Sequence, residues 1–171
     1  RVPHLPDVRL DKYRRRSRCA QPHGIGQFGS QKGADFIAEC GSCVELRGMG
    51  QASRIANNLM GAGYNGHSIY AERYAGILVS GNNRFPRGSS SLHFSGVARS
   101  SVTGNRFHSF YPGMLILADG CSENLVSSNH FLRDREPWAP MHDYDNGLDD
   151  RFGLLRIDGD NNSVLANHIS L

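Results

Sequence analysis

The stretch Val102-Thr103-Gly104-Asn105-Arg106-Phe107 recurs 24 residues later as Val126-Ser127-Ser128-Asn129-His130-Phe131. Each copy has a β-branched residue, two mostly small residues and then an asparagine. The same pattern leads to an asparagine five times along the chain, with spacings of 24, 23, 24 and 38 residues, at Asn58, Asn82, Asn105, Asn129 and Asn167. The sequence therefore contains an internal repeat of about 24 residues with one insertion near residues 133–150.

A second periodic series has the same step and the same insertion. Its members are pairs of residues separated by one position: Val44-x-Leu46, Ser68-x-Tyr70, Leu92-x-Phe94, Leu115-x-Leu117 and Leu155-x-Ile157. Short alternating runs between Gly, Asn and Ser are typical of strands joined by turns. Two series with one period indicate stacked, equivalent coils. The pattern predicts an all-β fold, a right-handed parallel β-helix.

The recurring asparagine is expected at a tight bend of each coil, in a left-handed backbone conformation that Asn tolerates. Stacked asparagine side chains would also satisfy one another's amide groups. A leucine-rich repeat is the alternative solenoid, but it requires a denser leucine frame. Glycine is frequent, with 20 of 171 residues, which disfavours a helical bundle.

A chain of 171 residues fits one domain. Regular coils begin at about Gly33, so we expect an irregular basic segment at residues 1–33 and β-helix coils at residues 34–171, with the inserted loop at residues 133–150. The basic segment either caps the solenoid or marks this chain as a C-terminal portion of a longer β-helix.

Residues 1–33 carry eight basic and two acidic side chains. The cluster Arg14, Arg15, Arg16 and Arg18 could contact phosphates, but no aromatic platform accompanies it, so we expect a solvated tail and no nucleic-acid partner.

No apolar window approaches the roughly 18 residues of a spanning helix, and no secretory signal is visible, so no membrane association is expected. Cys40 and Cys43 form a CxxC without a second ligand pair, so no metal or cofactor is expected.

Alternation along Val44-Glu45-Leu46 turns Glu45 outward if Val44 and Leu46 point inward. The periodic series places Ile69, His93, Ile116 and Arg156 at the equivalent outward positions of later coils. Glu45 and His93 would then lie about 10 Å apart, two strands away from each other. Outward isoleucines need a cover, which favours a subunit contact or a loop on this face. A solvated sheet with ordinary salt bridges is the alternative.

The inserted loop at residues 133–150 contains the only tryptophan, Trp138, and six of the sixteen acidic residues. A ring with nearby carboxylates suits a sugar, because the carboxylates accept its hydroxyl hydrogens. A calcium loop is a competing interpretation, but Asp143-x-Asp145-Asn146-Gly147 places its glycine one step too early for an EF-hand. The third interpretation is a solvated loop without a ligand.

Several segments resemble the inulin fructotransferases and the related difructose anhydride III hydrolases, glycoside hydrolase family 91. The resemblance covers residues 34–171. It is carried by the run Ile37-Ala38-Glu39-Cys40-Gly41-Ser42-Cys43-Val44-Glu45-Leu46 and then by Met60-Gly61-Ala62-Gly63, Ser80-Gly81-Asn82-Asn83-Arg84-Phe85-Pro86-Arg87-Gly88, Phe110-Tyr111-Pro112-Gly113-Met114-Leu115 and Asn146-Gly147-Leu148-Asp149-Asp150.

The resemblance implies a homotrimer of β-helices with active sites between neighbouring subunits. It also implies release of a cyclic difructose anhydride from inulin, a β-2,1-fructan, by intramolecular fructosyl transfer. The alternatives are the hydrolase, which opens a difructose anhydride with water, and a non-catalytic β-helix that binds carbohydrate or supports an assembly. An inulin-degrading protein would be extracellular, whereas the hydrolase would be cytoplasmic.

The family's catalytic glutamate matches Glu45, and its catalytic aspartate falls at Ala34, next to Asp35. Asp35 is therefore the candidate partner, although one step along a strand reverses a side chain. Two carboxylates suit general acid-base catalysis across an oxocarbenium-like transition state. The expected substrate-binding residues are Glu39, Arg87, His93, Trp138, Asp149 and Asp150.

Overall fold

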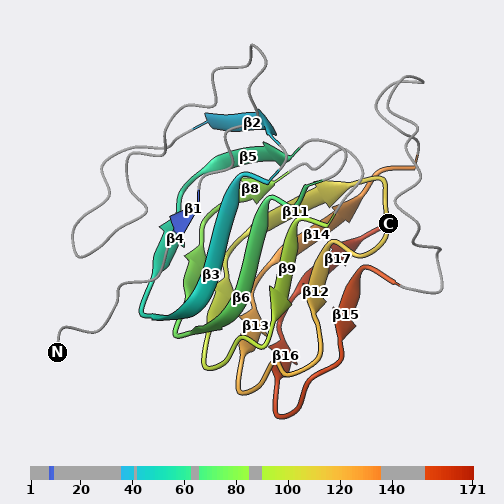
Figure 1. Ribbon diagram of the computed structural model, residues 1–171. Helices are drawn as coiled ribbons and strands as arrows, with labels where there is room; N and C mark the ends of the chain where they lie inside the picture. Colours follow the sequence, from blue (N-terminus) through green and yellow to red (C-terminus); the bar gives the residue numbers. More distant parts are fainter. Residues whose placement is uncertain (1–7, 10–35, 41, 63–65, 85–89, 136–152) are drawn as a thin grey trace, which may run out of the picture.

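The computed structural model describes residues 8–9, 36–40, 42–62, 66–84, 90–135 and 153–171. Every regular element in these residues is a β-strand, and the strands form three sheets that run side by side along the molecule (Figure 1). In this part of the chain, no helix is long and apolar enough to cross a membrane.

The first sheet has the strand order β1-β3-β6-β9-β12-β15. The segment β1 is antiparallel to β3, and the other neighbours are parallel. The bounds of its strands are β1 Val8–Arg9, β3 Val44–Gln51, β6 Ile69–Ala75, β9 Leu92–Ser95, β12 Leu115–Leu117 and β15 Leu155–Ile157.

The second and third sheets are wholly parallel. The second contains β4 Arg54–Ala56, β7 Leu78–Ser80, β10 Ser101–Thr103, β13 Leu125–Ser127 and β16 Ser163–Leu165. The third contains β2 Phe36–Cys40, β5 Leu59–Ala62, β8 Asn83–Arg84, β11 Arg106–Ser109, β14 His130–Arg133 and β17 His168–Ser170.

Each coil contributes one strand to each sheet, and the strands of successive coils pair in register. Val102 of β10, for example, pairs with Val79 on one side and with Val126 on the other. The predicted parallel β-helix with about 24 residues per coil is therefore confirmed. The repeat in the sequence corresponds to one turn of the solenoid.

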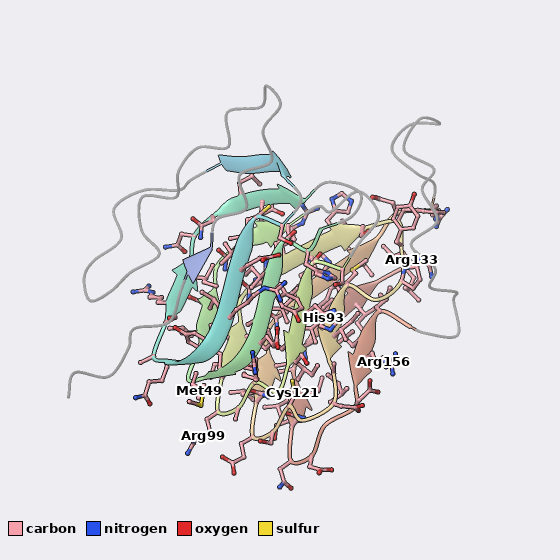
Figure 2. The ribbon with its side chains drawn as sticks, in the orientation of Figure 1. Met49, His93, Arg99, Cys121, Arg133 and Arg156 are labelled. Atoms are coloured by element: carbon pink, nitrogen blue, oxygen red, sulfur yellow. The ribbon has the colours of Figure 1, made fainter. Side chains whose placement is uncertain are left out.

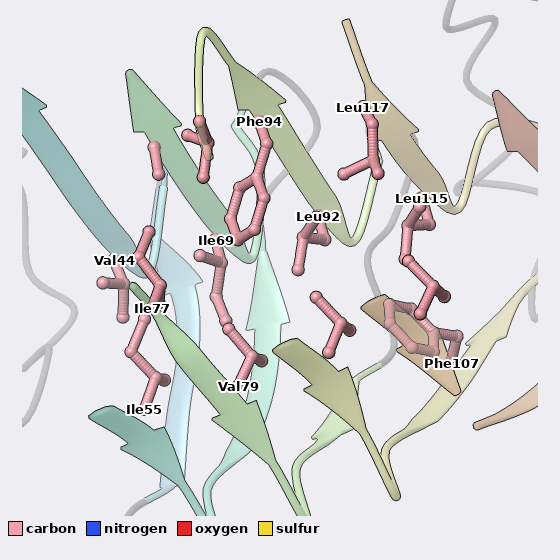
Figure 3. Packing of buried hydrophobic residues seen from close by; sticks show 14 of the residues in the cluster. Val44, Ile55, Ile69, Ile77, Val79, Leu92, Phe94, Phe107, Leu115 and Leu117 are labelled. Carbon is pink, nitrogen blue, oxygen red and sulfur yellow. The ribbon is translucent and has the colours of Figure 1, made fainter. Parts of the chain in front are cut away.

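The core lies between the three sheets and consists of rows of like side chains from successive coils. Figure 3 shows side chains of the first sheet, including Val44 and Leu92, facing those of the second, including Val79. The rings of Phe107 and Phe131 stack in the third row with their centroids 4.6 Å apart. These rows bury the inward side chains of the inner coils, which is why the sequence alternates there with period 2. In the last coil, Val164 and Ile169 remain about half exposed.

The five repeated asparagines form one continuous ladder at the bend between the second and third sheets, as predicted. The Nδ2 group of Asn105 donates to Oδ1 of Asn129 at 2.9 Å, and Nδ2 of Asn82 donates to Oδ1 of Asn105 at 2.9 Å. Asn58 and Asn167 continue this ladder at its two ends. Backbone N–H groups of Asn58, Asn82, Asn105 and Asn129 donate to the same oxygens.

The predicted left-handed conformation of these asparagines is wrong by one position. The residue before each asparagine has the positive φ: Asn57 (59°), Gly81 (63°), Gly104 (64°), Ser128 (54°) and Ala166 (51°). The chain reverses at that preceding residue, while the asparagine side chain turns inward to bind backbone groups. At Gly81 an added Cβ would lie 2.5 Å from Oδ1 of Asn57, so a larger residue there would require the Asn57 side chain to move.

A second ladder, which we did not predict, supports the bend between the first and second sheets. Its members are Ser100, Asn124 and Asn162: the backbone N–H of Ser100 donates to Oδ1 of Asn124, and Nδ2 of Asn124 donates to Oδ1 of Asn162. The residues before them, Arg99 and Glu123 among them, again have positive φ. Its spacings of 24 and 38 residues equal those of Asn105, Asn129 and Asn167, so the sequence contained the signal.

Candidate functional site

The outer face of the first sheet carries the residues that the sequence singled out, with one correction. Strand pairing aligns Glu45 with Tyr70, Tyr70 with His93, His93 with Ile116 and Ile116 with Arg156. The outward positions of Glu45, His93, Ile116 and Arg156 are thus confirmed, and Figure 2 shows His93 and Arg156 on this sheet. The prediction for Ile69 is wrong, because Tyr70 occupies that place.

Ile69 is fully buried and continues the inward row of Val44 and Leu92. The error has a structural cause: β3 contains an irregularity between Arg47 and Gly50, where the pairing with β6 shifts by one residue. Gly48 has a φ of 99° and Met49 is 93% exposed there, as a β-bulge requires. The bulge lengthens the first coil by one residue, so the inward row steps by 25 residues from Val44 to Ile69.

Charged side chains connect the first two coils of this face. Arg47 donates from Nε to Oε2 of Glu45 at 3.3 Å and from Nη1 to Oε2 of Glu72 at 3.2 Å. The carboxylate of Glu72 also accepts the Tyr70 hydroxyl at 3.4 Å, and its Oε1 pairs with Nε of Arg73 at 3.3 Å. Both oxygens of Glu72 are therefore engaged. Among the described residues, Oε1 of Glu45 has no hydrogen-bond partner.

Three rings meet directly beside Glu45. The centroid of His67 lies 5.7 Å from that of Tyr70 and 4.9 Å from that of His93, and the centroids of Tyr70 and His93 are 5.5 Å apart. His67 Nδ1 lies 2.6 Å from Oγ of Ser90, which holds the imidazole in place. The guanidinium of Arg47 lies 4.8 Å from the centroid of the Tyr70 ring.

Burial sets the charge of these groups. It lowers the pKa of His67 to about 4, helped by the neighbouring His93. Burial also lowers the pKa of His93, and the charge of Arg156 acts in the same direction. Burial and the Glu72 carboxylate raise the pKa of the Tyr70 hydroxyl. At neutral pH the three rings are therefore uncharged. They lie next to Glu45, whose Oε1 is unbound as far as the described side chains go.

The chain is similar to several known proteins. A family model described as the β-helix repeat of inulin fructotransferase matches residues 128–171. The chain is 40% identical over 146 residues to the DFA-I-forming inulin fructotransferase of Arthrobacter globiformis, which covers 81% of this chain. It is 67% identical to the DFA-IIIase of Arthrobacter chlorophenolicus A6 in a crystal structure with GF2, with a TM-score of 0.75 over 78% of this chain.

The resemblance to the inulin fructotransferases is confirmed. A second structure of the same DFA-IIIase, without its lid, superposes with a TM-score of 0.76 over 80% of this chain. The chain spans 35% of the fructotransferase of A. globiformis and 32 to 33% of these DFA-IIIase chains, about a third of the length of its relatives.

The structure brings together only some of the residues that the resemblance to the inulin fructotransferases implied. Glu45 and His93 share one face, two strands apart. Glu39 lies in β2, on the edge of the third sheet, where the pairing with β5 is irregular between Ala38 and Cys40. The other candidates lie outside the described residues: Asp35, Arg87, Trp138, Asp149 and Asp150.

Sequence reasoning missed four residues on the outer face of the first sheet: Arg47, His67, Tyr70 and Glu72. Arg47 and Glu72 follow Glu45 and Tyr70 by two positions, so alternation could have placed them once the register was correct. His67 precedes its strand at a corner, where alternation fails, and periodicity alone gave no signal for it. The described His, Cys, Asp and Glu side chains include no group of three that could hold a metal ion.

Proposed function

We propose that this chain is the part of a fructan-acting enzyme that carries its general acid-base residue, Glu45. The observation that supports this most directly is the outward position of Glu45, whose Oε1 has no hydrogen-bond partner among the described residues, in a chain that is 40% and 67% identical to two fructan enzymes. Glu72 is not an equivalent candidate, because both of its oxygens already bind cations or the Tyr70 hydroxyl.

The principal proposal is an inulin fructotransferase-like reaction of the lyase type. A hydroxyl group of one fructosyl unit attacks the anomeric carbon of its neighbour, a new C–O bond closes the cyclic difructose anhydride, and the glycosidic C–O bond to the remaining fructan breaks. The proton of the attacking hydroxyl ends on the departing oxygen, so no water is consumed. A carboxylate that can take up and return one proton meets this requirement, and such assistance contributes about 10² to 10⁴-fold.

A second carboxylate is needed on the other side of the oxocarbenium-like transition state. The family's aspartate corresponds to Ala34, and Asp35 is the neighbouring candidate. For this reason we expect weak inulin turnover, or none, from the 171-residue chain by itself. We also propose that Glu45 lies near a contact with a second copy in a trimer, as the resemblance to the inulin fructotransferases implies. Ile116 does not bear on this contact, because it is only 8% exposed at its outward position and the chain itself therefore covers it.

The hydrolase is the second candidate, because the chain is also 67% identical to a DFA-IIIase. In that reaction water, rather than a fructosyl hydroxyl, attacks the anomeric carbon, and the cyclic disaccharide opens. The same Glu45 would activate the water or protonate the leaving oxygen. The fructotransferase would work outside the cell, where inulin is present, and the hydrolase inside it.

Product analysis tests the proposal. The relative from A. globiformis, with glutamine at the position aligned to Glu45, should lose about 10²-fold or more in kcat with little change in KM, because the amide keeps the shape but cannot exchange a proton. Unchanged turnover would exclude the assigned role. For the present chain, separate incubations with inulin and with difructose anhydride III distinguish the fructotransferase reaction from the hydrolase reaction. Only the fructotransferase reaction releases a cyclic product. Rapid formation of that product would refute the expected weak activity.

A further inference from the structure

The rings of His67, Tyr70 and His93 form a cluster on the protein surface. The packing of the core does not depend on this cluster. Their strands are held by inward residues, such as Ile69 and Leu92, whereas the three rings lie on the outside and are partly exposed. They come from two coils and meet with centroids 4.9 to 5.7 Å apart. A second histidine pair, His130 and His168 on the outer face of the third sheet, has a similar 5.0 Å separation but no tyrosine and no glutamate paired beside it.

Polar contacts fix the cluster before any ligand arrives. The Tyr70 hydroxyl donates to Glu72 at 3.4 Å, and the Arg47 guanidinium lies against the same ring. His67 is held by Ser90 through Nδ1. A binding surface made of side chains that are already ordered loses little conformational entropy when a ligand binds.

The chemistry of the cluster suits an uncharged polyhydroxyl ligand. Both imidazoles are neutral at neutral pH. His93 can therefore offer one ring nitrogen as donor and the other as acceptor to sugar hydroxyls, whereas His67 offers Nε2, because its Nδ1 is bound to Ser90. Two arginines among the described residues act on the cluster, and both are already paired: Arg47 is shared between two carboxylates, and Arg156 pairs with Asp158. This disfavours a phosphate or carboxylate ligand. Aromatic rings also supply apolar contact area for the C–H groups of a sugar ring.

The position of the cluster relates it to Glu45. Tyr70 is the direct strand partner of Glu45, and His93 is the direct partner of Tyr70. Neighbouring strands are about 4.8 Å apart, so a furanose ring that covers Tyr70 and His93 brings its bridging oxygen to the free side of the Glu45 carboxylate. Ile116 is the strand partner of His93 and the next residue of this outward row, so the polar surface ends there at an apolar side chain.

We propose that His67, Tyr70 and His93 form a binding subsite for one fructofuranosyl unit, directly beside Glu45, with Tyr70 as its main contact surface. This inference rests on the proposed function and adds the residues that hold the sugar. Tyr70 and His67 take part in binding and not in proton transfer.

The test is a titration of the 171-residue chain with the trisaccharide GF2, followed by isothermal calorimetry and by ¹H–¹⁵N NMR spectra. Tyr70→Ala should weaken GF2 binding about five- to tenfold or more, because the central ring is lost. Tyr70→Phe should bind within about threefold of the wild type, because the ring remains and only the hydroxyl bond to Glu72 disappears. Glu45→Gln should also remain within about threefold, since it removes proton exchange and not the ring surface.

The matched control is His168→Ala, which removes a histidine ring from the other histidine pair and should leave the affinity unchanged. Intact amide signals for Asn82, Asn105 and Asn129 verify that each variant is folded. The proposal is overturned if Tyr70→Ala binds GF2 like the wild type, if the wild type does not bind GF2, or if the shifted signals surround His130 and His168. One pair of results would reject the subsite and leave the proposed function standing. These are loss of turnover in the glutamine variant of the A. globiformis relative and unaltered GF2 binding by Tyr70→Ala in this chain.

Discussion

The asparagine bend and the outer face of the first sheet use polar side chains in opposite ways. At the bend, Asn105 accepts hydrogen bonds from Asn82 and donates to Val79, Thr103 and Asn129, so its amide is satisfied within the chain. On the outer face, Glu45 is anchored through Oε2 and keeps Oε1 without a partner among the described residues. The bend stabilises the solenoid, whereas the face retains polar atoms that a ligand can use.

The sequence reflects this difference. The bend repeats one residue type in five successive coils, because a ladder functions only if each member resembles its neighbours. The outward row of the first sheet instead reads Glu45, Tyr70, His93, Ile116 and Arg156, with no two members alike. In a repeat protein, the row that departs from the repeat is therefore where a functional site is to be sought.

The largest predicted difference in stability is between variants of two neighbouring residues of β6. Ile69→Ala should lower the free energy of unfolding by about 2–5 kcal/mol, because it leaves a cavity in a fully buried row. Tyr70→Ala should cost only about 1 kcal/mol or less, because that side chain lies on the outside. Urea unfolding measured by circular dichroism checks both values. Equal costs for the two variants would contradict the corrected register.

Replacing an asparagine of the ladder between the second and third sheets should have the next largest effect on the free energy of unfolding. Asn105→Ala should cost about 2–4 kcal/mol, since the N–H of Asn82 and the carbonyl oxygens of Val79 and Thr103 lose partners in a buried place. Glu45→Gln should change stability by no more than about 0.5 kcal/mol. Comparable losses for these two variants, in the same unfolding experiment, would remove the distinction between the bend and the face.

His67 makes part of the stability of the face dependent on pH. Its pKa is about 4 when folded and near 6.5 in an unfolded chain, so only the unfolded state takes up a proton as the pH falls between these values. The contribution of neutral His67 to the free energy of unfolding is complete above pH 6.5. It is lost progressively toward pH 4, by about 1–3 kcal/mol given the partial exposure of the side chain. His67→Gln should therefore show a shallower decline in stability over this range than the wild type. Parallel curves for the two proteins would exclude this role, and His168→Gln serves as the control.

Arg84 provides a smaller test inside the solenoid, where not every polar atom is satisfied. Its guanidinium is fully buried against the ring of Phe107 and donates to Asn105. Nε and Nη1 find no hydrogen-bond partner within the described ranges, and burial lowers the pKa of Arg84 to about 9. Arg84→Met should leave stability unchanged or raise it by about 1–2 kcal/mol, because it removes an uncompensated buried charge. A loss above about 2 kcal/mol, seen by urea unfolding, would show that the charge is compensated.

The fold could be predicted because the Asn and apolar rows repeat, and strand alternation placed Glu45 and His93 correctly. The register of Tyr70 could not be predicted, because the bulge at Gly48 and Met49 adds one residue without an apolar signal. The left-handed position was assigned to the asparagine although the residue before it makes the turn. His67 joins the site only through the packing of a corner, which no periodicity encodes.

A crystal structure of this chain with GF2 would test the central claim, that the outer face of the first sheet is the fructan-handling surface, most directly. We predict a fructosyl ring over Tyr70 and His93, with one of its oxygens within about 2.6–3.2 Å of Oε1 of Glu45. GF2 bound on the outer face of the second or third sheet, with the first sheet unoccupied, would contradict the account.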